Sequence, residues 1–150
     1  MQFDPDAAFQ IASAIAASGW ILLLASPLMP IWSQRLSGQA IPLLLAAGYC
    51  ALVLAYWSRG EGGFDSLDNV AALFRSRELL LAGWVHYLAF DLFVGAWEAR
   101  TARREAIAFV LVIPCLILTF LFGPVGLLLF SAIRFARRSG KAIEVEGMKP

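Results

Sequence analysis

Four apolar runs separated by polar segments make up most of this chain. Crossing the ~30 Å hydrocarbon core of a bilayer takes about 20 helical residues, with about 17 as the lower limit, and every run is long enough. The pattern therefore predicts an all-α, integral membrane four-helix bundle in a single domain, residues 1–135. A basic and mixed tail, residues 136–150, is expected to be flexible. The four predicted spans are residues 7–32, 41–57, 78–98 and 107–135.

Prolines and glycines indicate where these helices bend. Pro27 and Pro30 are predicted to bend or end the first helix close to Trp32. The fourth run is longer than a span requires, and Pro114 and the pair Gly123–Pro124 interrupt it, which predicts a kinked or broken fourth helix. Irregular backbone at membrane depth is tolerated only against protein or a wet cavity, so residues 119–126 are predicted to form a cavity wall.

Two polar segments connect the first three runs. Residues 33–39 are predicted to form a turn, and residues 58–77 form the longest polar segment. Within the latter, Asp65 and Ser66 are suited to cap a short helix that would lie on the membrane surface. Asp65 and Asp68 could contact a substrate or could form only a solvated polar face, and the sequence leaves both interpretations open.

Composition supports a membrane protein and excludes several other classes. The chain is 60% hydrophobic and 15% charged, whereas soluble domains are nearer half and a quarter. A formal net charge of +1 gives no reason to expect a nucleic acid as partner. Cys50 and Cys115 both lie in apolar runs, and the chain has one histidine, so we expect neither a disulfide framework nor a metal, and no cofactor.

Charge also predicts an orientation. The first run has no basic residue before it and is too long for a cleaved signal peptide, so we expect it to remain as a helix. Four spans would place both termini on one side of the membrane. Lysines and arginines then divide eight against four, which favours cytoplasmic termini in a bacterial inner membrane. Small residues recur at helical spacing in the first two runs and would allow a homodimer.

The third run carries two ionisable groups, His86 and Asp91, near its middle. Such groups are costly in hydrocarbon and normally face the interior of a bundle. Positions five apart on a helix differ by about 140° around the axis and about 7.5 Å along it. The two side chains are therefore expected to flank an inward-facing arc rather than to pair. Glu98 shares a helical stripe with Asp91, but beside Arg100 it is expected to be an interfacial charge.

The segment Trp84–Phe93, with Pro114–Leu116 and Phe120–Leu127 after it, resembles the plant neoxanthin-synthase family and its bacterial relatives. This is the family named for abscisic-acid deficiency, and the resemblance covers about residues 42–135. It implies an integral membrane protein that acts on a carotenoid or a related isoprenoid. Plant members are needed to turn violaxanthin into neoxanthin, an isomerisation that opens a 5,6-epoxide to an allene and a tertiary alcohol without a redox cofactor.

That isomerisation requires a proton to leave the polyene and another to reach the epoxide oxygen, which is general acid–base chemistry. The resemblance implies that His86 and Asp91 perform it, with His86 as base and Asp91 as acid or with the roles reversed. Polar and aromatic residues of the same segments, and of the polar segment before them, are expected to contact the substrate: Trp84, Tyr87, Phe90, Thr119, Phe122, Asp65 and Asp68.

Other interpretations compete with an isomerase. His86 and Asp91 could only hold neighbouring helices together by hydrogen bonds. The same cavity could bind a carotenoid or lipid without turnover. His86 could be an axial haem ligand, or Asp91 could titrate during the cycle of a small proton-coupled transporter.

Overall fold

The computed structural model describes the backbone of residues 3–147 and the side chains of residues 3–138, and the described part is helical with no strand. This confirms the all-α class. A π-helical stretch, Leu36–Ala40, and a short 3₁₀ turn, Trp57–Arg59, flank α3. The α-helices are α1 (Pro5–Leu24), α2 (Pro30–Arg35), α3 (Ile41–Tyr56), α4 (Leu67–Leu73), α5 (Arg77–Arg104), α6 (Phe109–Phe122) and α7 (Pro124–Gly147).

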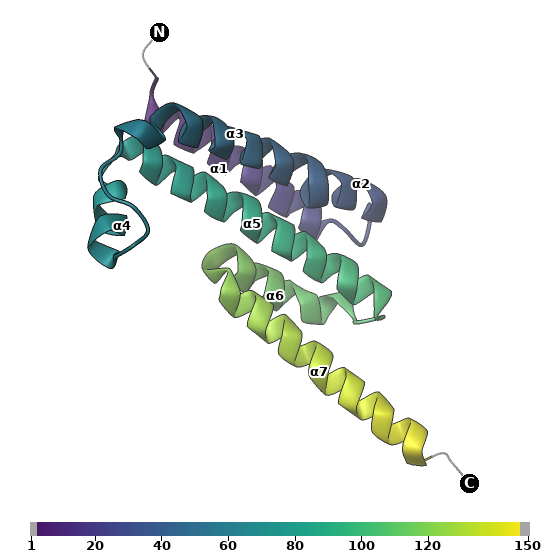
Figure 1. Cartoon of the computed structure of the whole chain (residues 1–150). Helices are drawn as coiled ribbons and strands as arrows, with labels where there is room; N and C mark the ends of the chain where they lie inside the picture. Colours follow the sequence, from purple (N-terminus) through teal and green to yellow (C-terminus); the bar gives the residue numbers. More distant parts are fainter. Residues whose placement is uncertain (1–2, 148–150) are drawn as a thin grey trace.

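The long helix α5 is the centre of the molecule. It packs against α1 and α3 on one side and against α6 on the other (Figure 1). Its first turn is capped by Ser76, whose hydroxyl oxygen accepts a hydrogen bond from the backbone N–H of Leu79. Within residues 3–147, three helical segments have the length and apolar composition of membrane spans, namely Pro5–Leu24, Pro30–Arg59 and Arg77–Arg104.

The first two spans differ from their predicted bounds. The first helix ends at Leu24, well before Trp32, and Pro30 then begins α2, because a proline fits the first position of a helix but not its interior. Residues 33–39, which we expected to form a turn, are helical. The π-helical stretch Leu36–Ala40 joins α2 to α3 and places the hydroxyl of Ser37 2.7 Å from the carbonyl oxygen of Gly19, to which it donates.

The polar segment between α3 and α5 contains the short helix that the sequence predicts. The hydroxyl oxygen of Ser66 accepts a hydrogen bond from the backbone N–H of Asn69 and caps α4. Leu73 is buried, whereas Asp65 and Asp68 are exposed. The helix lies at the end of the bundle where α3 ends and α5 begins, away from α6 and α7 (Figure 1).

The fourth apolar run is a helical hairpin. The break predicted at Gly123–Pro124 is confirmed, since α6 ends at Phe122, Gly123 adopts a positive φ of 45° and Pro124 begins α7. The run is not one kinked span, however, because α7 folds back along α6 (Figure 1). The close approach requires Gly126, where a Cβ atom would lie 2.0 Å from the hydroxyl oxygen of Thr119. Pro114 lies inside α6 without ending it.

The hairpin changes the relation between the termini. The helix α6 has 14 residues and its tip lies beside the middle of α5, so the chain enters and leaves this region from the same end (Figure 1). The start of α1 and the end of α7 consequently lie at opposite ends of the molecule, whereas four spans would have put them together (Figure 1). Residues 136–147 of the predicted flexible tail continue α7, and residues 148–150 lie outside the described part.

Candidate functional site

One face of α5 carries three polar side chains that meet the α6–α7 hairpin. Tyr87, Asp91 and Glu98 are four and seven residues apart, a spacing that places them on one helical face. The Tyr87 hydroxyl donates to the backbone carbonyl oxygen of Phe120 in α6 at 3.3 Å. The Asp91 carboxylate faces the hairpin turn at Gly123. The hairpin therefore covers a row of polar groups on an otherwise apolar helix.

The Asp91 carboxylate sits directly under the turn of the hairpin. A Cβ atom at Gly123 would lie 2.8 Å from its Oδ1 atom and 3.3 Å from its Oδ2 atom, so only a glycine leaves room for it. The Oδ2 atom is buried and has no hydrogen-bond partner among the described residues. A buried polar atom without a partner costs about 1–3 kcal/mol. Such an atom in a native fold requires an explanation, and a functional role is one of the few available.

Glu98 is a second carboxyl group in the interior, and the sequence interpretation missed it. Its side chain has 0% exposure, and the fully buried Thr119 hydroxyl lies 3.1 and 3.2 Å from its two carboxylate oxygens. We expected an interfacial charge, which is wrong because α5 continues to Arg104 and α6 covers this turn. The signal that could have found it was present, since Glu98 lies two helical turns from Asp91 on the same stripe.

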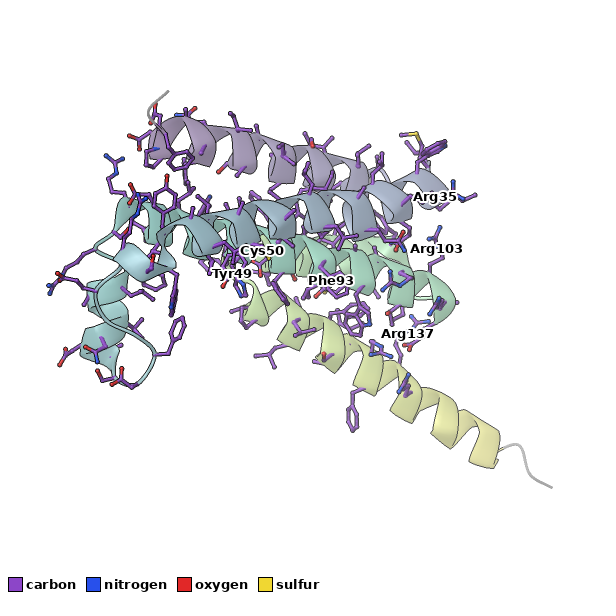
Figure 2. All side chains as sticks on the ribbon, turned by 45° about the horizontal axis from the view of Figure 1, so that its top comes forward. Arg35, Tyr49, Cys50, Phe93, Arg103 and Arg137 are labelled. Carbon is purple, nitrogen blue, oxygen red and sulfur yellow. The ribbon has the colours of Figure 1, made fainter. Side chains whose placement is uncertain are left out.

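His86 and Phe90 lie on another face of α5. The His86 ring is exposed, stacks on Phe90 with ring centroids 4.6 Å apart, and lies 5.4 Å from the ring of Tyr49 in α3. Figure 2 shows Tyr49 and Phe93 on this side of the molecule. The predicted 140° separation thus directs His86 and Asp91 to different neighbours. The structure does not bring His86 into the inward-facing arc that we expected it to flank.

The remaining predicted contacts are divided between the site and other places. Tyr87 and Thr119 belong to it, and Phe122 is an exposed residue at the tip of the hairpin. Trp84 lies one turn before the site, where its indole N–H donates to the Ser13 hydroxyl at 3.0 Å. Asp65 and Asp68 are at the far end of the bundle. No group of three potential metal ligands occurs among the described residues.

An apolar groove of about 210 Å³ runs between α1 and α6 beside this site. Phe120 connects the two, because its side chain lines the groove and its carbonyl oxygen accepts the Tyr87 hydrogen bond. Trp20 lies edge-on to Phe120 at 5.5 Å and fills the space over Gly95. The groove residues are Ala17, Trp20, Ile21, Leu24, Leu116, Ile117 and Phe120.

The fold and this site define a helical protein with three segments suited to span a membrane, a helical hairpin against them and carboxyl groups in its interior. The chain belongs to the ABA4-like family, described as ABA DEFICIENT 4-like, whose model matches residues 7–130. This confirms the resemblance and places the chain in a neoxanthin-synthase-like group of membrane proteins. No curated protein matches the chain, and no solved structure matches it.

Proposed function

We propose that this protein spans a membrane and isomerises a carotenoid or a related isoprenoid by acid–base chemistry at Asp91. The observation that supports the proposal most directly is the unpartnered Oδ2 atom of Asp91, buried beneath the Gly123 turn. A carboxylate with one oxygen that is buried and lacks a hydrogen-bond partner is available to take a proton from a substrate. The substrate class is the one that the resemblance implies, and membership of the ABA4-like family supports it.

Tyr87 is a better placed partner for Asp91 than His86. Tyr87 lies one helical turn from Asp91 on the face that the hairpin covers, whereas His86 faces α3. The Tyr87 hydroxyl makes one hydrogen bond of 3.3 Å, to Phe120, which a substrate oxygen could replace. In this scheme Asp91 is the base and Tyr87 the acid, in place of the His86–Asp91 pair implied by the resemblance.

The proposed step balances without a redox partner. The Asp91 carboxylate removes a proton from the polyene carbon beside the epoxide, and the electron pair of that C–H bond forms the new double bond of the allene. The epoxide C–O bond breaks, and its oxygen takes the Tyr87 proton to become the tertiary alcohol. Proton transfer from Asp91 to Tyr87 then restores both groups for the next turnover. General acid–base assistance of this kind contributes about 10²–10⁴ in rate.

The groove between α1 and α6 provides a path for a rod-like apolar substrate. Its walls are aliphatic and aromatic, and its lining residues extend over two turns of α1, from Ala17 to Leu24, and over one turn of α6, from Leu116 to Phe120. A polyene lying there would bring its end group to Phe120 and, with a small displacement of that ring and of Trp20, to Tyr87 and Asp91. Glu98 and Thr119 hold the hairpin in place behind them.

The experiment is turnover of a 5,6-epoxy carotenoid by the protein in lipid nanodiscs, with the allenic product measured by chromatography. Asp91→Asn should lower the rate by at least about 100-fold, and Tyr87→Phe should lower it by at least about ten-fold. His86→Gln is the matched control, since it removes an ionisable group from the same helix on another face, and it should keep the rate. Full activity of Asp91→Asn, or loss of activity in His86→Gln alone, would overturn the assignment.

A proton-coupled transporter is the second candidate, and the hairpin is the observation that favours it. Transporters use helices that end at the middle of the membrane and direct their termini at ions or substrates. Here α6 ends and α7 begins beside the Asp91 carboxylate. Proton flux into sealed vesicles, abolished by Asp91→Asn and accompanied by no chemical change in the carotenoid, would select this function over the isomerase.

A further inference from the structure

The turn between α5 and α6 forms a basic hollow with the outer part of α7. Arg134 and Arg138 both bind the Glu105 carboxylate; Arg134 also donates through its Nε atom at 2.9 Å, and Arg138 lies 2.8 Å from Oε1. Arg137 donates instead to the backbone carbonyl oxygen of Ala106 at 3.3 Å. A hollow of about 200 Å³ remains, lined by Glu105, Ile107, Arg134, Arg137 and Arg138.

Positive charge exceeds negative charge at this hollow. All the ion pairs found at this end of the described chain converge on Glu105, so a single carboxylate faces three guanidinium groups. Arg103 is nearby on α5, and Figure 2 shows Arg35, Arg103 and Arg137 at the same end of the molecule, on α2, α5 and α7. The described arginines here are Arg35, Arg100, Arg103, Arg104, Arg134, Arg137 and Arg138.

The opposite end of the molecule has the reverse balance. Acidic residues outnumber basic ones there, and the Arg77–Asp6 ion pair joins α5 to α1. The acidic residues are Asp4, Asp6, Glu61, Asp65, Asp68 and Glu78, and the basic ones are Arg59, Arg75 and Arg77. An anionic partner would therefore be recruited to the α5–α6 end only.

We propose that this hollow binds the phosphate group of an anionic phospholipid. Guanidinium groups are suited to phosphate because they donate two parallel hydrogen bonds. Arg134 is held in place by stacking over the rings of Trp97 and Phe130, at 5.5 and 5.9 Å from their centroids. Arg137 and the 68%-exposed Arg138 side chain can turn toward a ligand in the hollow.

The surroundings select a lipid rather than a soluble anion. The hollow lies where the apolar part of α7 gives way to its arginines, which is the level of lipid headgroups for a helix inserted in a bilayer. Phe135 is 75% exposed between Arg134 and Arg137 along the chain, and Ile107 forms part of the floor. Acyl chains would cover this apolar surface while the phosphate meets the guanidinium groups. The site is independent of Asp91, and residues 134–138 lie outside the family match.

The test uses the full chain in a neutral detergent, titrated with phosphatidylglycerol or phosphatidylcholine and followed by native mass spectrometry and thermal melting. The wild type should retain phosphatidylglycerol and melt at a higher temperature with it, while phosphatidylcholine should have little effect. Arg137→Gln should bind phosphatidylglycerol about five-fold more weakly, the loss expected for one basic residue near an anionic surface. This variant leaves the Glu105 ion pairs in place, so it should fold.

The matched control is Arg75→Gln, which removes the same charge at the other end of the molecule and should bind as the wild type does. Equal weakening in both variants would mean that only net charge matters and would overturn the proposal. If the wild type retained phosphatidylcholine as well as it retains phosphatidylglycerol, the proposal would also be overturned. Inorganic phosphate at millimolar concentration should not displace the lipid; complete displacement would show a site for free phosphate instead.

Discussion

The hydroxyl oxygen of Thr119 on α6 lies 3.1 and 3.2 Å from the two carboxylate oxygens of Glu98 on α5, and neither side chain has any solvent exposure. A hydroxyl carries one hydrogen, so the two carboxylate oxygens share it. Gly126 of α7 packs closely against the same Thr119 side chain. Three helices therefore meet at one hydrogen bond, which fixes how deeply the hairpin sits against α5.

Thr119→Val should destabilise the protein, because it removes the donor and leaves a buried carboxyl group without a partner. The expected loss is about 1–3 kcal/mol, seen as a lower melting temperature in detergent. Thr119→Ser keeps the hydroxyl, so its melting temperature should fall less than that of Thr119→Val. A loss in Thr119→Ser as large as the loss in Thr119→Val would contradict the prediction, because the serine variant keeps the hydroxyl that the valine variant removes.

Gly123→Ala should disrupt the hairpin turn. Its φ of 45° disfavours any side chain, and a Cβ atom would lie 2.8 Å from the Asp91 Oδ1 atom. Strained backbone of this kind costs about 1–3 kcal/mol, and the Asp91 carboxylate would have to move as well. Gly48→Ala in α3 is the control, since nothing lies within 4 Å of its Cβ position. That variant should melt at or above the wild-type temperature, and a comparable decrease in both would contradict the prediction.

The sequence predicted the places where the chain breaks better than the directions it takes afterwards. Gly123–Pro124 is a strong helix breaker, and Ser66 is a strong helix cap, so both features could be predicted from local chemistry. A glycine–proline pair such as Gly123–Pro124 is expected in the sequence whether the helix only kinks there or the chain reverses its direction. The reversal depends on the positive φ of Gly123 and on the close contact at Gly126, both of which are set by packing between helices far apart in sequence.

The candidate site was predictable to a similar extent. Helical geometry alone gave the angle between His86 and Asp91 and the stripe shared by Asp91 and Glu98. It could not give the direction of the interior, because α5 has apolar residues around most of its circumference. The end of the third span was placed at Glu98 because three arginines follow it. In the structure these arginines lie in the last turns of a longer helix, and Glu98 is covered by α6.

A low pH should weaken the ion pairs that join Glu105 to α7 at the end of the hairpin opposite its turn. Hydrogen bonds from Arg134 lower the pKa of Glu105 from 4.5 to about 2, and Arg138 adds to the effect. Because the pKa is lower in the folded state, the stabilisation is complete above pH 4.5 and is lost as the pH falls toward 2. Glu105→Gln should therefore melt at a lower temperature than the wild type at pH 6. It should also lose less stability than the wild type between pH 4.5 and the lower limit of the assay.

That comparison separates Glu105 from the other carboxyl groups, which titrate in both proteins. The measurement is the difference in melting temperature between wild type and variant across the pH series, which should shrink as the pH falls. A difference that stays constant from pH 6 downward would mean that Glu105 does not contribute through its charge.

The hairpin predicts a membrane topology that differs from four spans. Three spans place the termini on opposite sides, and the arginine-rich α5–α6 end should be cytoplasmic by the positive-inside rule. An alkaline phosphatase fused after residue 150 should then be inactive in bacterial cells, and one fused before residue 1 should be active. A fluorescent protein that matures only in the cytoplasm should give the reverse pattern. Both termini on one side would mean that α6 and α7 do not form a hairpin that enters and leaves the membrane from the same face.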